Sequence, residues 1–470
     1  MEPHKFSFKR ICSGRRLQAF ASIIAALNAV SDGMHIGWSS PIIPRLLSPS
    51  SPIPVTREDV PWLENSYMVG VLVAVIPLAY LSDQIGRKMT ILVACVIQLS
   101  AWVLFIFATT PTALIIARLL AGIGGQVNYI TTPVYVTEIS DKGIRGRLGS
   151  IVFIMGPIGI LTVYALGAYT ATINTYIFGA ALVVIILLIF PMMPESPYYL
   201  LLKDKKEEAR TQLMRLRSVE NVDEEIDDMI IVACGVDMSI KRFISIFTAK
   251  GNLKALIITM VLNASNNFSG FIVLMMNMET IFSELTANIS ASTFGVLIAV
   301  VVIISSLIGA SLLDCLGRRM LLILSCFLTS AFLMFIAIYL TAKGNGWDLT
   351  HFSWVPIVAI VGHGVTQKGG IGLIPILLSA EIFPRNLTAM GCAFGSMLYS
   401  VSGIASLLIY QYANAYIGVN APFYIFGAYM LFAGTFCVFM VPETKKKSLH
   451  ETQELCNQKV GEQDSRVQHC

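Results

Sequence analysis

Long apolar runs alternate with short polar gaps along almost the whole chain. In the first half they cover about 17–40, 61–81, 89–108, 111–133, 148–170 and 172–192. In the second half they cover about 252–276, 290–313, 319–341, 353–379, 386–411 and 421–441. An α-helix needs roughly 20 apolar residues to cross the hydrocarbon core of a bilayer. The pattern therefore predicts an all-α membrane protein with about twelve transmembrane helices in two six-helix halves.

One short basic turn occurs once in each half. Residues 83–88 read D-Q-I-G-R-K and residues 314–319 read D-C-L-G-R-R, so both copies follow the pattern D-x-x-G-R-[KR]. Each copy fills a short gap between two apolar runs. A repeat of this kind indicates a duplicated protein whose two halves run parallel in the bilayer, a layout used by secondary transporters.

The polar segments divide the chain into five parts. We expect an N-terminal segment at 1–16, a helical bundle at 17–192, a linker at 193–250, a second bundle at 251–441 and a tail at 442–470. The linker has a basic amphipathic stretch from Lys203 to Arg217, followed by an acidic stretch at 220–228. It is predicted to form short helices.

The cations cluster in alternate gaps. Hydrophobic residues make up 55% of the chain and charged residues only 13%, and Lys and Arg gather at 87–88, 142–147, 318–319, 385 and 445–447. Cytoplasmic loops of membrane proteins carry such an excess, so both termini are predicted to be cytoplasmic. The net charge of +4 is explained by these loops and does not indicate a nucleic-acid partner. Asn288-Ile-Ser lies in a predicted outer loop and is a candidate glycosylation site.

Several enzyme and metal motifs are absent from the sequence. The nine cysteines contain no C-x-x-C pair, and the chain has no P-loop, no H-E-x-x-H and no G-x-S-x-G. We therefore expect neither an enzyme nor a metal or other cofactor.

A set of ordered motifs accompanies the two basic turns. Glu138 and a basic stretch ending R-G-R at 145–147 follow the fourth run, and E-I-F-P-R at 381–385 follows the tenth. P-E-S-P at 194–197 follows the sixth run, and P-E-T-K at 442–445 follows the twelfth. In this order the motifs resemble the sugar porter family of the major facilitator superfamily. Through G-W-S-S-P at 37–41, the chain is most similar to the insect facilitated trehalose transporters.

The resemblance implies a major facilitator fold, a sugar or related solute as substrate, the cell membrane as location, and a set of gating ion pairs. These pairs would hold the two halves together on the cytoplasmic side and break when the carrier opens inward. The residues implied are Arg87, Arg118, Glu138, Arg145, Arg318, Arg319, Glu381 and Arg385.

The positions that hold sugar in the family are altered here. The seventh run normally carries Gln-Gln-x-Ser-Gly-x-Asn, and this chain has Asn266, Asn267 and Ile272 at the three amide positions. The tenth run normally reads Gly-Pro-x-Pro-Trp, and Ile376 stands at the position of the Trp. Lys368 lies near the place where many members have a Glu. Either the substrate differs from the usual sugars, or transport is weakened.

Three ionisable residues inside the runs indicate a cavity, since a charge in hydrocarbon is costly. Asp32 and His35 lie three residues apart on the first run and are expected to share a face, and Lys368 lies in the tenth. Asp32 could pair with Lys368 or form a proton relay with His35. By the family pattern the coupling Asp of proton symporters is replaced by Met34, which favours a facilitator.

Three functions remain open from the sequence. The first is facilitated transport of a sugar such as trehalose or a hexose by alternating access. The second is a sensor that binds solute and moves little of it. The third is a carrier, proton-coupled or not, of a different small solute. The sequence predicts a small-molecule substrate and a lipid environment and leaves the oligomeric state open.

Overall fold

The computed structural model describes residues 14–443 apart from 142, 220, 235–249, 286–289, 376–377, 379–381 and 384–387. Its first half contains eight α-helices. They are α2 (Gly14–Gly37), α3 (Ser39–Leu46), α4 (Val60–Gln84), α5 (Arg87–Phe107), α6 (Pro111–Gly125), α7 (Val127–Ile139), α8 (Arg145–Tyr169) and α9 (Thr172–Ile189).

Three short helices follow a 3-10 turn, η1 (Phe190–Met192), and connect the halves. They are α10 (Pro197–Leu202), α11 (Lys206–Arg217) and α12 (Asp223–Cys234). The second half contains α14 (Lys250–Phe268), α15 (Phe271–Met276), α16 (Met278–Leu285), α17 (Ala291–Leu316), α18 (Arg318–Gly344), η2 (Thr350–Phe352), α19 (Val355–Thr366), η3 (Gln367–Ile371), α21 (Thr388–Tyr416) and α22 (Ala421–Met440).

Eleven helical segments of the described chain are long and apolar enough to cross a membrane. The all-α fold predicted from the sequence is confirmed. The predicted tenth span, 353–379, is not among these eleven. Its described part contains α19 and the π-helix η3, and residues 376, 377 and 379 lie outside the described residues. The first span is longer than predicted, since α2 and α3 together cover Gly14–Leu46.

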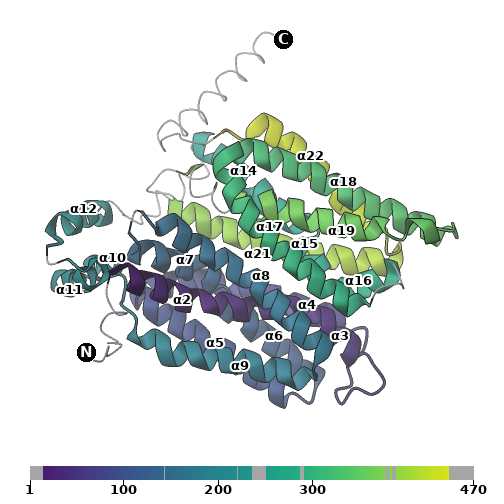
Figure 1. Ribbon diagram of the computed structural model, residues 1–470, viewed down its shortest axis with the longest axis horizontal. Coiled ribbons are helices and arrows are strands. Elements are labelled where there is room, and N and C mark those ends of the chain that lie inside the picture. Colours follow the sequence, from purple (N-terminus) through teal and green to yellow (C-terminus); the bar gives the residue numbers. More distant parts are fainter. Residues whose placement is uncertain are drawn as a thin grey trace, which may run out of the picture.

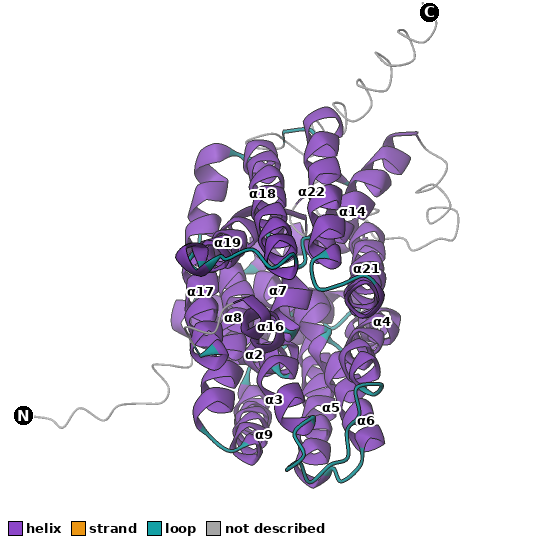
Figure 2. Ribbon diagram, turned by 90° about the vertical axis from the view of Figure 1, so that its right-hand side faces the viewer, coloured by secondary structure: helices purple, strands orange, loops and turns teal. Residues whose placement is uncertain are grey.

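The two halves lie one above the other in Figure 1, with α2–α9 below and α14–α22 above. They meet along two helix pairs, in which α8 packs against α17 and α4 packs against α21. In Figure 2, turned by 90° from this view, α16 lies near the middle between the two halves and α3 lies just below it.

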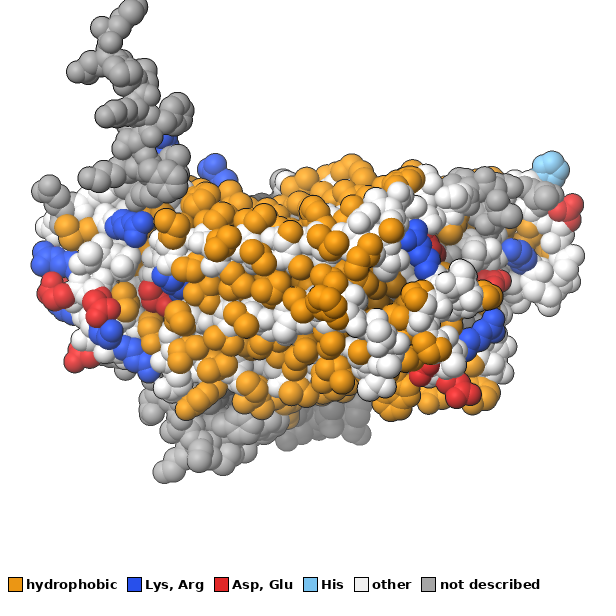
Figure 3. Space-filling model, turned by 90° about the horizontal axis from the view of Figure 1, so that it is seen from below, with side chains coloured by type: hydrophobic (Ala, Val, Ile, Leu, Met, Phe, Trp, Pro, Cys, Tyr) orange, Lys and Arg blue, Asp and Glu red, His pale blue; other side chains and the backbone are white. Residues whose placement is uncertain are grey.

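The two ends of the bundle differ in composition. We call the end with the linker helices and the two G-R turns the motif end, and the end with α3 and α16 the far end (Figure 1). Between them, Figure 3 shows a broad band of apolar side chains, with charged side chains gathered toward the ends. Exposed side chains such as Val73, Ile76 and Leu188 are apolar. Such a band is the surface that a bilayer would cover.

Candidate functional site

A cavity of about 150 Å³ lies between the two halves. Its wall includes four of the residues predicted from the sequence, namely Asp32, Asn266, Ile272 and Lys368. Polar side chains of both halves complete it: Gln126, Asn128 and Tyr129 come from the first half, and Asn263, Ser306 and Tyr399 from the second. A cavity with hydroxyl and amide groups on both walls can bind a small polar solute.

Asp32 is buried on the first-half side of the cavity. Its carboxylate accepts a hydrogen bond of 2.8 Å from the hydroxyl of Tyr67 in α4. Gly125 leaves room for it, since a Cβ at that glycine would come within 1.9 Å of the carboxylate. The predicted ion pair with Lys368 is not formed, as Asp32 is partnered by Tyr67 within its own half.

Lys368 lies in η3 on the second-half side of the cavity. Its Nζ lies 4.2 Å from the centre of the Phe271 ring, over the ring face. A π-helix turn inserts an extra residue and is frequently found at functional sites. Here the π-helix places Lys368 in the cavity wall. The sequence alone indicated a continuous membrane span at this position.

His35 is not among the residues that line the cavity, and its role as a solute-binding residue stays a prediction. Its ring stacks on Trp102 of α5, with the ring centres 4.0 Å apart, and both ring nitrogens lack a hydrogen-bond partner. Asp32 and His35 are three residues apart, yet one turns to the cavity and the other into the first-half bundle. This arrangement does not support a proton relay between them.

The two amides of the seventh span have different surroundings. Asn266 lines the cavity and its Oδ1 accepts a 3.0 Å hydrogen bond from Gln367. Asn267 instead donates to the carbonyl of Tyr399 at 2.7 Å and to Ser402 at 2.9 Å. Asn267 therefore joins α14 to α21, and its contact with solute stays a prediction. Ile272 lines the cavity, and Ile376 lies outside the described residues.

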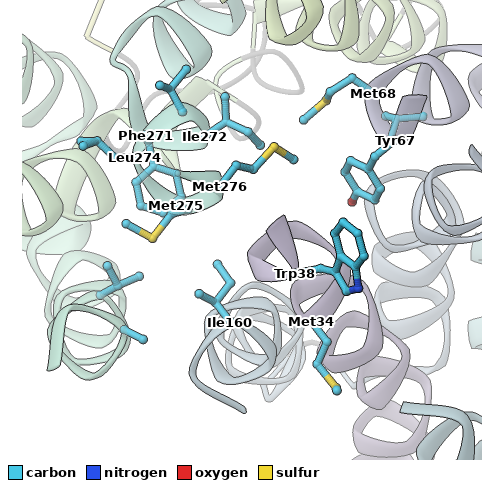
Figure 4. Close-up of a cluster of buried hydrophobic side chains, with 14 of the residues drawn as sticks. Met34, Trp38, Tyr67, Met68, Ile160, Phe271, Ile272, Leu274, Met275 and Met276 are labelled. Carbon is cyan, nitrogen blue, oxygen red and sulfur yellow. The ribbon is translucent and has the colours of Figure 1, made fainter. Parts of the chain in front are cut away.

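The far end of the cavity is closed by α15. All six of its side chains, Phe271–Met276, are buried. In Figure 4, Met276 extends from α15 toward Met68 and Trp38 of the other half. The Tyr164 hydroxyl donates a hydrogen bond to the carbonyl of Met275, and Ser40 accepts one of 3.1 Å from the Glu279 backbone. These contacts join the two halves at the far end.

A buried carboxylate that the sequence analysis overlooked also lies at this junction. Glu64 of α4 is fully buried and accepts a 2.6 Å hydrogen bond from Gln411 of α21. Gln411 in turn accepts one of 3.1 Å from Asn65. Glu64 could have been identified from the sequence, because it is a carboxylate inside the predicted span 61–81.

The two G-R turns have the same structure in both halves. Gly86 and Gly317 have positive φ angles of 98° and 87° and precede α5 and α18. Glu195 accepts a 3.1 Å hydrogen bond from the Lys88 backbone, and Glu443 accepts one of 3.1 Å from the Arg318 backbone. In each half the P-E motif thus places a carboxylate at a helix N-terminus, where the helix dipole favours negative charge.

Five of the predicted gate residues lie at the motif end, namely Arg87, Glu138, Arg145, Arg318 and Arg319. The hydrogen bonds and ion pairs described for them join residues of the same half. Arg87 forms a 3.0 Å ion pair with Glu138, which also accepts a 2.5 Å hydrogen bond from Ser196. Arg145 donates to the carbonyl of Ser140 at 3.4 Å, and Arg319 donates to that of Val438 at 2.6 Å. Glu381 and Arg385, like the glycosylation candidate Asn288, lie outside the described residues. Pairing between the halves stays a prediction.

Arg118 lies apart from the other predicted gate residues, and its role as a gate residue stays a prediction. It is fully buried in the first half, where its Nε donates to the carbonyl of Leu63 at 3.0 Å and another guanidinium nitrogen donates to the carbonyl of His35. Its guanidinium lies 5.0 Å from the ring centre of Tyr67. Arg118 therefore holds α2, α4 and α6 together. Its position two turns into the fourth span could have indicated this.

Comparisons with known proteins agree with this architecture. The profile of the family described as "Sugar (and other) transporter" matches residues 29–456. The facilitated trehalose transporter Tret1 of Bombyx mori is 27% identical over 441 residues, covering 93% of this chain and 87% of that protein. Tret1 of Apis mellifera ligustica is 26% identical over 437 residues, covering 91% of this chain and 87% of that protein.

Among solved structures, the chain is similar to the proton:xylose symporter XylE. The structure bound to 6-bromo-6-deoxy-D-glucose has a TM-score of 0.72 at 17% identity and covers 93% of this chain and 98% of that one. The inward open conformation from E. coli has a TM-score of 0.75 at 16% identity, with coverage of 93% and 99%. At this identity the similarity shows the major facilitator fold.

Proposed function

Since this chain belongs to the sugar transporter family of the major facilitator superfamily, we propose that it carries a monosaccharide-sized solute across the cell membrane by alternating access. The observation that supports this most is a polar cavity shared by both halves, with the buried helix α15 at one end. Rocking of the halves would break the far-end contacts and expose the same cavity to the other side.

The lining residues indicate which side the cavity faces. Ser150 lies in the second turn of α8 and Ser396 in the third turn of α21, in helices that begin near the motif end, so the cavity extends toward that end. We assign the motif end to the cytoplasm because the Lys- and Arg-rich gaps lie there. Both termini would then be cytoplasmic, and the conformation described here would face inward.

The cavity's size bears on the solute. At about 150 Å³ it is smaller than the roughly 300–1,000 Å³ of pockets for drug-sized ligands. This supports a monosaccharide-sized solute more than a disaccharide. The trehalose activity named for the insect relatives is therefore the second candidate, and it requires a larger cavity in another conformation.

Energy coupling is also part of the proposal. Asp32 is hydrogen-bonded to Tyr67 inside the first half, and His35 has no side-chain hydrogen-bond partner. With no chain of hydrogen bonds between them, a facilitator driven by the solute gradient is the simplest mechanism. A proton-coupled carrier and a non-transporting sensor are the alternatives.

Counterflow in liposomes tests these readings. Purified protein is reconstituted, loaded with unlabelled sugar, and exposed to labelled glucose or trehalose with and without a pH gradient. Glucose counterflow that does not depend on the gradient would support facilitated transport, and dependence on the gradient would indicate proton coupling. Binding without counterflow would support the sensor and contradict the proposed transport.

A further inference from the structure

The cavity contains a cation with no carboxylate partner. Lys368 is the only basic residue among the described residues of the wall, and its Nζ faces the ring of Phe271. The only carboxylate in the same wall, Asp32, is hydrogen-bonded to Tyr67. A lysine at this depth, with an aromatic ring as its neighbour, is a site for an anionic group of a bound solute.

The backbone around Lys368 keeps the side chain accessible. Lys368 belongs to the π-helix Gln367–Ile371, which contains two glycines, and Gly372 follows directly. Gly369 lies so close to Gly309 of α17 that a Cβ at Gly309 would lie 2.8 Å from the Cα of Gly369. The π-helix therefore packs closely against α17 at Gly309, and Lys368 lines the cavity.

The remaining wall is suited to hydroxyl groups. Asn128 lines the cavity, and its Oδ1 is buried and has no hydrogen-bond partner. The Asn128 amide nitrogen donates to the carbonyl of Gly125 at 3.0 Å, which fixes the direction of its free oxygen. The rings of Tyr129 and Tyr399 lie 6.2 Å apart, one from each half. A free acceptor beside aromatic rings is what a polyhydroxylated solute would bind.

Together these observations extend the proposed function, on which they rest. We propose that Lys368 binds the carboxylate of a sugar acid, so that the preferred solute is a monosaccharide carrying one negative charge, such as a uronate. Its hydroxyls would meet Asn128 and Asp32 on the opposite wall. Lys368 would then determine specificity between charged and neutral sugars.

Thermal stabilisation of the purified protein measures binding separately from transport. Glucuronate is titrated against glucose and against acetate, a carboxylate without hydroxyls. We expect glucuronate to stabilise the protein at concentrations at least about tenfold lower than either control. Lys368→Met should abolish this preference, and Lys368→Arg should retain it. Lys206→Met, which removes a lysine from the linker helix α11, is the matched control and should behave like wild type.

The outcomes separate this inference from the proposed function. If the wild type binds glucuronate no better than glucose, or if Lys368→Met binds it equally well, the inference is overturned. Counterflow of labelled glucose in the same preparation tests transport independently. Glucose counterflow without a preference for glucuronate would support the proposed transport function and contradict the proposed anion site at Lys368. The melting temperature of each variant without ligand reports whether it is folded.

Discussion

Gln411 of α21 donates a 2.6 Å hydrogen bond to the buried carboxylate of Glu64 in α4. The two residues belong to different halves, and both lie near the far end, where α15 closes the cavity. A buried hydrogen bond to a charged group is worth about 1.5–3 kcal/mol. This bond therefore favours the conformation in which the far end is closed.

Removing Gln411 should shift the protein toward opening at the far end. We expect Gln411→Ala to raise the open population by roughly 10- to 100-fold, since it removes this hydrogen bond from the buried carboxylate of Glu64. The measurement is the rate of maleimide labelling of a cysteine introduced at Met276, which is buried in the closed state. Val401→Ala on the lipid-facing side of α21 is the control. Equal labelling of Gln411→Ala and the control would contradict the role of this contact.

Two ion pairs near the motif end should differ strongly in their effect on stability. Arg87 and Glu138 are 6% and 13% exposed, whereas Lys205 and Glu208 are 53% and 59% exposed. Breaking a buried pair costs about 3–5 kcal/mol, and an exposed pair contributes about 1 kcal/mol or less. Arg87→Ala should therefore lower the melting temperature in detergent far more than Lys205→Ala. Similar decreases in melting temperature for the two variants would contradict a larger stabilising effect of the Arg87–Glu138 pair.

The turn glycine of the first half should not tolerate a side chain. Gly86 has a φ of 98°, and a Cβ there would lie 2.5 Å from the Glu195 carboxylate. We expect Gly86→Ala to destabilise the protein by about 1–3 kcal/mol, through backbone strain and displacement of that carboxylate. Gly143→Ala is the comparison, because a Cβ at Gly143 meets nothing within 4 Å. A wild-type melting temperature for Gly86→Ala would show that the turn can rearrange.

The same carboxylate predicts a dependence on pH. Burial raises the pKa of Glu195 above its usual value of 4.5. The folded protein then holds this proton more tightly than the unfolded chain. The resulting stabilisation is complete below pH 4.5 and is lost as the pH rises through the folded-state pKa. The melting temperature of the wild type relative to Glu195→Gln should therefore fall as the pH is raised from 4.5 toward neutral. A constant difference across that range would contradict the raised pKa.

The sequence predicted the helices well because each span is an uninterrupted apolar run of sufficient length. It did not predict the π-helix at Gln367–Ile371, which packs closely against Gly309 of α17, because this contact joins residues that are far apart in the sequence. The paired motifs were visible as repeats. Only the structure showed that Glu195 and Glu443 each cap the helix that follows a G-R turn.

Whether a predicted residue lies at the site depends on the direction of its side chain, toward the cavity or into the bundle of its own half. Asp32 and Lys368 line the cavity as their charge suggested, but His35 and Arg118 are buried within one half. A helix in a bundle is buried on more than one face, so a polar residue can turn either to the cavity or to a neighbouring helix. Spacing along α2 could not separate these two cases for Asp32 and His35.

The central claim is that the two halves rock about the shared cavity, and paired spin-label distances test it most directly. One pair, at Leu47 and Trp347, reports on the far end, and another, at Met89 and Met320, reports on the motif end; all four side chains are exposed. When Gln411→Ala is compared with the unaltered protein in liposomes, the far-end distance should increase while the motif-end distance decreases. Distances that stay unchanged, or that change in the same direction at both ends, would contradict alternating access.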